Sequence, residues 1–167
     1  MTPRVVLVGP MGAGKTTIGG LLAESWGLAF RDTDADIEAV EGREISEIFV
    51  DSGEGYFRDL ERTTVAAAVA EHDGVLALGG GAVLDPATRR LLSGHRVVFL
   101  KVGLSEAVKR VGLGTSRPLL LGNVRARIKA LLDERTPIYE EVATEIVDTD
   151  GRTPDEVAAE ILRTVTA

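Results

Sequence analysis

Residues 4–16 read RVVLVGPMGAGKT, and this stretch decides the fold. The run at 4–9 is short, apolar, β-branched and ends in glycine, which is typical of a fully buried strand in a parallel sheet. GPMGAGKT at 9–16 matches the GxxxxGK[ST] phosphate-binding pattern. Apolar residues then follow a helical spacing as far as Trp26. The pattern therefore stands between a strand and a helix, where it has structural meaning.

The loop itself is predicted to bind a nucleotide. Its glycines let the amide hydrogens turn inward around phosphate oxygens, and the helix N-terminus adds partial positive charge. Lys15 would lie against the β- and γ-phosphates, and the Thr16 hydroxyl would be a ligand for Mg2+. The alternative is a tight strand-to-helix turn without a ligand. The candidate ATP-binding residues here are Gly12, Ala13, Gly14, Lys15, Thr16 and Thr17.

Strand-like and helical segments alternate along the rest of the chain. Further strands are predicted at 29–32, 75–78, 97–102 and 145–147, with helices at 35–40, 45–50 and 54–71 and after Pro86, Ser105 and Thr153. This order is typical of an α/β fold with a mostly parallel five-stranded sheet covered by helices on both faces. Ligands should then bind at the C-terminal ends of the strands.

Composition limits the classes of function. The 167 residues, 44% of them hydrophobic, are enough for one domain spanning 1–167. A net charge of -7 argues against nucleic-acid binding. The cations are 15 arginines and 4 lysines, a bias that suits an anionic substrate because arginine recognises carboxylates and phosphates with a forked geometry. The absence of cysteine excludes disulfides, thiolate metal sites and cysteine nucleophiles.

The only strongly apolar N-terminal run, at 5–8, is far too short to span a bilayer. We therefore expect a cytoplasmic protein that does not bind membranes, and we expect a monomer. The segment GLGTSRPLLLG at 112–122 has three glycines and no clear period between two predicted helices. It predicts a mobile lid at about 112–123.

Asp32 and Asp34 follow the second predicted strand. In an extended chain, alternate residues point the same way, which would place both carboxylates on one side about 7 Å apart. Asp32 would then hold water on Mg2+, and Asp34 would orient or deprotonate an attacking hydroxyl. The alternative is that both are caps of the helix that follows.

A charged helix pattern and a glycine triplet are two further features of the sequence. Arg58 and Arg62 lie four apart on a predicted helix that carries Glu54 and Glu61, a pattern that ordinarily forms a solvated face with ion pairs. The triplet Gly79, Gly80 and Gly81 closes the third strand, where it suggests that another group approaches the main chain closely. A flexible turn is the alternative for this triplet.

Arg117 lies in the predicted lid, where a cation on a closing segment could neutralise charge on a transferring phosphoryl group. Arg135 has no strong local rationale, although Pro137 after it predicts a bend near a helix end.

Taken together, the segments resemble the shikimate kinase family: GPMGAGKTT at 9–17, DTD at 32–34, FRDLE at 57–61, GGG at 79–81, SRPLL at 116–120 and ERTPIY at 134–139. Their order and spacing cover nearly the whole chain. The resemblance implies a three-layer P-loop kinase fold similar to that of nucleoside monophosphate kinases, with a helical substrate-binding region at about 33–61. It also implies transfer of a phosphoryl group from ATP to the 3-hydroxyl of shikimate, with one Mg2+ ion as cofactor.

The resemblance further implies roles for individual residues. Arg58 and Arg135 would bind the shikimate carboxylate, and Asp34 would bind the ring hydroxyls. The other implied contacts are Gly80 and Gly81 at the border of the same pocket, Phe49 and Phe57 as its apolar walls, and Arg110 with the loop from Arg152 to Pro154 beside adenine.

The chain departs from the family pattern at two positions. Thr16 stands where many relatives have serine, and Gly20 stands where arginine is frequent. Two rival functions stay open from sequence. One is a P-loop kinase for another polyol acid such as gluconate, or for a nucleoside monophosphate. The other is a non-catalytic module that senses ATP and signals to a partner protein.

Overall fold

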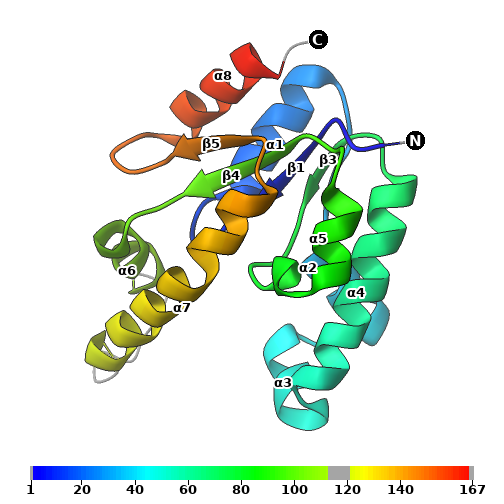
Figure 1. Cartoon of the computed structure of the whole chain (residues 1–167), viewed down its shortest axis with the longest axis vertical. Coiled ribbons are helices and arrows are strands. Elements are labelled where there is room, and N and C mark those ends of the chain that lie inside the picture. Colours follow the sequence, from blue (N-terminus) through cyan, green and yellow to red (C-terminus); the bar gives the residue numbers. More distant parts are fainter. Residues whose placement is uncertain (1, 113–120, 166–167) are drawn as a thin grey trace.

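The computed structural model describes residues 2–112 and 121–165, and its centre is a five-stranded sheet of wholly parallel strands (Figure 1). The strand order is β2-β3-β1-β4-β5, so the sheet predicted from the sequence is confirmed. The strands are β1 (Val5–Val8), β2 (Phe30–Asp32), β3 (Val75–Ala77), β4 (Val97–Lys101) and β5 (Glu145–Asp148).

Helices cover both faces of this sheet, which gives the three predicted layers. On one face, Val5 and Leu7 of β1 pack in a buried cluster with α1 (Lys15–Trp26) and α8 (Pro154–Thr164). On the other face, Val6 and Val8 join a second cluster. Its helices are α4 (Glu54–Glu71), α5 (Pro86–Leu92) and α7 (Leu121–Val142). Since β1 is buried on both sides, its sequence is continuously apolar.

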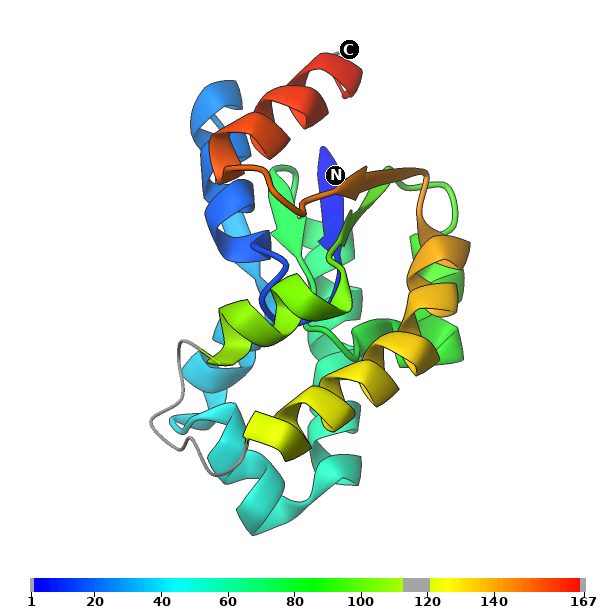
Figure 2. The same cartoon turned by 90° about the vertical axis from the view of Figure 1, so that its left-hand side faces the viewer.

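A smaller helical unit extends from the end of β2, as Figures 1 and 2 show. It comprises α2 (Thr33–Glu41), α3 (Ile45–Ser52) and the first half of α4. Ile37, Ile48 and Phe57 are buried together at its centre. This core is separate from the two clusters on the sheet, so the unit is stabilised largely by its own packing.

The remaining helices are η1 (Ala82–Leu84), a short 3-10 turn after β3, and α6 (Leu104–Gly112). Most of the predicted lid, including Arg117, lies outside the described residues. Within the described part of the chain, no helix combines the length and apolar character that crossing a membrane requires.

The parallel order places three loops at one edge of the sheet. β2, β3 and β1 are neighbours. β2 ends at Asp32, β3 is followed by Gly79–Gly81, and β1 is followed by the phosphate loop. Gly9, at the end of β1, allows the close approach of β4, because a Cβ atom there would lie 2.7 Å from the Leu100 carbonyl oxygen. The candidate residues of three distant segments therefore meet.

Two adjacent glycines in α1 are expected to respond in opposite ways to alanine. A Cβ atom at Gly20 would meet nothing within 4 Å, whereas one at Gly19 would lie 2.3 Å from the Phe30 ring. Because alanine favours a helix interior by about 1 kcal/mol over glycine, G20A should raise the midpoint of thermal unfolding by about 2–4 °C. G19A should lower it, since Phe30 packs against the core and would have to move.

Circular dichroism melts of both variants measure this difference, and each serves as the control for the other. A lower midpoint for G20A, or a G19A variant at least as stable as wild type, would contradict the packing described for α1.

Candidate functional site

A cavity of about 710 Å³ opens at this edge of the sheet. Its walls come from the phosphate loop, the start of α2, the helices α3 and α4, the glycine triplet and one face of α7. Segments far apart in sequence therefore contribute to a single site. The predicted residues that line it are Gly12, Gly14, Lys15, Thr16, Thr17, Asp32, Asp34, Phe49, Phe57, Arg58, Gly80, Gly81 and Arg135.

The phosphate loop has the backbone conformation that its glycines predict. Gly12 and Gly14 have φ of 83° and 95°, values that favour glycine. Gly14 precedes α1 and no side chain caps this helix, so its first amide hydrogens are available to phosphate oxygens. The Lys15 ammonium donates to the carbonyl oxygens of Gly9 at 2.6 Å and Pro10 at 3.0 Å.

The Lys15 side chain is half-buried. Desolvation of its ammonium by the surrounding protein lowers its pKa to about 8, although the nearby carboxylates of Asp34 and Asp32 act in the opposite direction. A desolvated cation whose charge is only partly compensated attracts an anionic ligand. The loop can therefore bind phosphate through both main-chain amides and one full charge.

Asp32 performs two tasks with its two carboxylate oxygens. Oδ1 accepts from the amide of Asp34 at 2.8 Å and from that of Ala35, so Asp32 is the N-cap of α2. Oδ2 accepts from the Thr16 hydroxyl at 3.3 Å, which places this oxygen beside the phosphate loop. The cap and the predicted metal-associated role of Asp32 are therefore compatible.

The pair formed by Thr16 and Asp32 suits a hard divalent cation. Both supply oxygen, and Mg2+ characteristically takes only one or two protein ligands together with phosphate oxygens and water. Among the described residues, no group of three or more His, Cys, Asp or Glu side chains could hold a metal ion by themselves. A metal at this site would thus depend on the phosphates of a bound nucleotide.

Asp34 reaches the cavity, but the geometry predicted for it is wrong. α2 begins at Thr33, so Asp34 lies in the first helical turn rather than in extended chain. The cap made by Asp32 starts the helix two residues earlier than expected. Asp34 Oδ1 is buried and has no hydrogen-bond partner in the described part of the protein.

The pKa of Asp34 is raised to about 6, first by burial and then by the neighbouring carboxylates of Asp32 and Glu61, while Lys15 partly offsets the rise. Asp34 is therefore largely ionised at neutral pH, yet its negative charge is poorly compensated. A ligand hydroxyl could donate to the unpartnered oxygen.

Charged side chains closely approach the glycine triplet, and the sequence predicts such a close approach. A Cβ atom at Gly79 would lie 2.4 Å from Asp34 Oδ1, and one at Gly81 would lie 2.5 Å from Arg58 Nη1. Hydrogen bonds made by the segment argue against the alternative of a flexible turn. Gly79 N donates to the Thr33 hydroxyl, and the carbonyl oxygens of Gly79 and Gly81 accept from the amides of η1.

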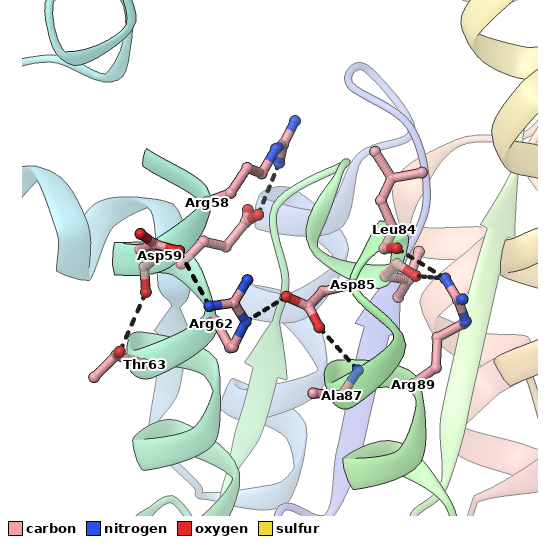
Figure 3. Close-up of polar contacts among 10 residues, drawn as sticks. Arg58, Asp59, Arg62, Thr63, Leu84, Asp85, Ala87 and Arg89 are labelled. Carbon is pink, nitrogen blue, oxygen red and sulfur yellow. Dashed lines mark hydrogen bonds and ion pairs between the residues drawn. The ribbon is translucent and has the colours of Figure 1, made fainter. Parts of the chain in front are cut away.

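Arg58 and Arg62 have different environments, although both lie on α4 (Figure 3). Arg62 has a half-exposed side chain that pairs with Asp59 and Asp85, so the surface interpretation is confirmed for it. Arg58 lines the cavity and donates through Nη1 to Glu61 Oε1 at 2.7 Å. Glu61, expected on a solvated face, is only 4% exposed, and burial raises the pKa of its carboxyl.

The predicted aromatic walls lie next to Arg58. The ring centroids of Phe49 and Phe57 are 4.9 Å apart, and the Arg58 guanidinium carbon lies 5.4 Å from the centroid of Phe57. This arrangement leaves little freedom to the Arg58 side chain, which is held by a carboxylate and faced by two rings.

Arg135 extends from α7 to the same place. Its Nε is buried without a hydrogen-bond partner among the described residues, and its Nη1 would lie 3.6 Å from a Cβ atom on Gly80. Since Arg58 reaches Gly81, the two guanidinium groups lie against successive residues of the triplet. Two forked cations converging on one point form a site for a planar carboxylate.

Other predicted residues are placed outside the cavity. Ala13 and Gly79 do not line it, nor do the two arginines expected beside adenine. Arg110 nevertheless lies next to the phosphate loop, donating to the carbonyl oxygens of Gly12 at 3.0 Å and Thr149 at 3.1 Å. Arg152 is bound to α8 through an ion pair with Glu160 at 2.8 Å.

The sequence prediction missed the contribution of α7 to the cavity. Five lining residues precede Arg135 on this helix, and their spacing of three and four residues is the signal that could have found them. They are Val124, Arg127, Ile128, Leu131 and Leu132. Glu61 was also missed as a site residue, because its burial depends on segments distant in sequence.

Comparison with known proteins gives a consistent result. Residues 11–166 match the model of the family described as shikimate kinase. A shikimate kinase of Frankia casuarinae is 63% identical over 153 residues, 92% of this chain and 68% of the relative. One from Streptomyces avermitilis is 59% identical, covering 96% of this chain and 94% of the relative. The solved shikimate kinase from Acinetobacter baumannii in complex with shikimate has a TM-score of 0.90 at 36% identity, covering 99% of this chain and 93% of that one.

Replacing Asp34 with asparagine is expected to stabilise the fold at neutral pH. The pKa of Asp34 in the folded protein, about 6, lies above the ordinary value of 3.8, so folding favours the protonated form. Wild type therefore loses stability as the pH rises from about 4 to about 6, whereas D34N does not titrate. The stability advantage of D34N should be about 1 kcal/mol larger near pH 8 than near pH 5.

Urea unfolding at the two pH values measures the effect. D73N is the matched control because Asp73 is exposed on the loop before β3, and this variant should follow wild type. A D34N advantage that is absent near pH 8, or equal at both pH values, would contradict the environment described for Asp34.

Proposed function

Because this chain belongs to the shikimate kinase family, we propose that the cavity binds ATP and shikimate side by side and transfers the γ-phosphoryl group to the 3-hydroxyl of shikimate. The protein is an ATP-dependent phosphotransferase with shikimate as its alcohol acceptor. The products are shikimate 3-phosphate and ADP, a step toward the aromatic amino acids.

The observation that carries this assignment is the meeting of two guanidinium groups at the glycine triplet. Arg58 and Arg135 approach Gly81 and Gly80, and Asp34 approaches Gly79. A molecule with a carboxylate and a ring hydroxyl would satisfy the two cations at one end and the unpartnered Asp34 oxygen at the other. Phe49 and Phe57 would face the apolar part of such a ring.

Positioning and charge neutralisation would supply most of the catalysis. Phosphoryl transfer has a loose transition state with little early proton removal, so Asp34 would chiefly aim the 3-hydroxyl at the γ-phosphorus. Lys15 would neutralise charge on the β- and γ-phosphates, and its lowered pKa indicates that burial leaves its charge poorly solvated before an anion binds. Arg117, which lies outside the described residues, would add a cation at the transferring group.

Thr16 and Asp32 would hold one Mg2+ ion, Thr16 by direct coordination and Asp32 through water. When bound, this ion supplies electrophilic stabilisation of the phosphate oxygens. Gly12 to Thr17 would hold the phosphates. Arg110 would lie toward the adenine through its contacts with Gly12 and Thr149, and Arg152 would flank the same side.

Two further proposals concern the working state of the enzyme. The enzyme would work as a monomer, since one chain supplies both the proposed phosphate-binding residues and the proposed shikimate-binding residues of the cavity. The need for ATP as co-substrate supports a cytoplasmic location.

Substrate choice is tested first. ATP consumption should depend on shikimate, and R58A should raise the KM for shikimate at least tenfold, since it removes a charge-assisted contact worth about 1.5–3 kcal/mol. R62A is the matched control because Arg62 lies one helical turn away and pairs with Asp59 and Asp85. A coupled assay for ADP across shikimate, gluconate and nucleoside monophosphates gives both results.

Equal turnover with gluconate or a nucleotide would favour the rival kinase functions. An R58A variant with the wild-type KM for shikimate would show that Arg58 does not bind the acid.

Catalysis is tested at Asp34. D34N should lower kcat about 100-fold or more, because the hydroxyl loses its orienting acceptor. The affinity for ATP should change much less, because Asp34 is not one of the proposed phosphate-binding residues and acts on the phosphate loop only through the charge of Lys15. Steady-state kinetics and nucleotide titration by fluorescence measure the two quantities. A D34N variant with the wild-type kcat would show that Asp34 does not orient the hydroxyl, whereas a wild-type protein that binds ATP without any shikimate-dependent turnover would favour the nucleotide-sensing module.

A further inference from the structure

Among the residues that the structure describes, Tyr139 has the largest fully buried side chain. Its hydroxyl points at the glycine triplet. The hydroxyl donates to the Gly80 carbonyl oxygen at 2.6 Å. The ring packs on Phe99 of β4, with centroids 5.0 Å apart. Burial raises the pKa of this tyrosine, so the hydroxyl keeps its proton at neutral pH and stays a donor.

This hydrogen bond fixes the orientation of one peptide unit in the cavity wall. No cis peptide bond occurs in the described residues, so the Gly81 amide points away from the Gly80 carbonyl oxygen. Since Tyr139 holds that oxygen, it also sets the direction of the Gly81 amide. Gly80 and Gly81 both line the cavity. Rotation of this peptide would therefore alter the surface that Arg58 and Arg135 face.

The same tyrosine fixes the part of α7 that carries Arg135. Arg135 and Tyr139 are four residues apart and lie on one face of the helix. Pro137 lies between them and has no amide hydrogen, so the carbonyl of Asp133 receives no helical bond from it. The helix is weakened locally, and the contacts of Tyr139 with Gly80 and Phe99 hold this section against the sheet.

We propose that Tyr139 is a positioning residue that fixes the Arg135 side chain and the Gly80–Gly81 peptide relative to each other. In this way Tyr139 would set the affinity for the substrate carboxylate. This role rests on the proposed function, in which Arg135 binds that carboxylate. Tyr139 does not line the cavity and acts through Arg135 and Gly80. The residues proposed to hold the nucleotide phosphates, Gly12 to Thr17, lie on a different segment from Tyr139. The Gly80 peptide is nevertheless a neighbour of the phosphate loop, since a Cβ atom at Gly80 would lie 3.7 Å from the Gly9 carbonyl oxygen and from the Met11 amide nitrogen. We therefore expect the effect on shikimate to be the larger one.

The first test is Y139F, which keeps the ring and removes the hydroxyl. Gly80 then loses its donor, and the KM for shikimate should rise about tenfold, because a buried acceptor without a partner destabilises the local arrangement. The KM for ATP should change less than about twofold. The other tyrosine, Tyr56, gives the matched control Y56F, since it is 44% exposed and donates to Glu41 at 3.2 Å. Y56F should leave both KM values unchanged.

A double-mutant cycle with R135K separates positioning from packing. Lysine keeps the charge of Arg135 but lacks its forked geometry, so R135K alone should raise the KM for shikimate. If Tyr139 acts through Arg135, the effect of Y139F in the R135K background should fall below about twofold. A thermal melt of each variant gives the fraction of protein that is folded at the assay temperature, so that lower activity caused by unfolding can be recognised.

Two results would overturn the positioning role. One is an equal rise in both KM values for Y139F, and the other is the same rise in the wild-type and R135K backgrounds. An R135K variant with the wild-type KM for shikimate would instead overturn the carboxylate-binding role proposed for Arg135, so the two failures are distinguishable.

Discussion

The parallel arrangement of β2, β3 and β1 is the constraint on which the whole site depends. Because these strands are neighbours and run in the same direction, their C-terminal ends bring Asp32, the glycine triplet and the phosphate loop to one edge of the sheet. Each loop alone would be a turn with polar residues. Because the segments are adjacent, the Asp32 carboxylate accepts a hydrogen bond from the Thr16 hydroxyl. For the same reason, the Asp34 carboxylate packs closely against Gly79. The buried β1, with helices on both faces, keeps this edge in place.

The electrostatics of the site favour a ligand over solvent. The pKa of Lys15 is lowered and that of Asp34 is raised, chiefly because burial removes water from both groups and so disfavours their charged forms. Asp34 Oδ1 and Arg135 Nε have no hydrogen-bond partner among the described residues, although each is buried. Such groups reduce the stability of the fold. A substrate that carries a hydroxyl and a carboxylate would provide partners for these groups. Binding would then be more favourable because it removes an energetic cost that the fold maintains in the free protein.

Sequence reasoning succeeded where the chemistry was local and failed where tertiary contacts decided it. The phosphate loop was predictable because its glycines, lysine and hydroxyl residue act within one turn. The glycine triplet predicted that some group approaches the main chain closely. It could not predict which groups these are, because Asp34 and Arg58 come from other segments. The extended geometry assumed for Asp34 failed because Asp32 caps a helix that begins at Thr33.

α4 shows most clearly why a local pattern cannot assign a role. Arg58 and Arg62 lie one turn apart, and either could form surface ion pairs. Their partners separate them. Arg62 meets Asp85, which caps α5 by accepting from Ala87 (Figure 3). Arg58 meets the exposed Glu54 and, unlike Arg62, also a buried carboxylate, that of Glu61. An ion pair shielded from water is held more firmly than an exposed one. Arg58 is thereby held beside Gly81, where it lines the cavity, which makes it suitable for recognising a carboxylate.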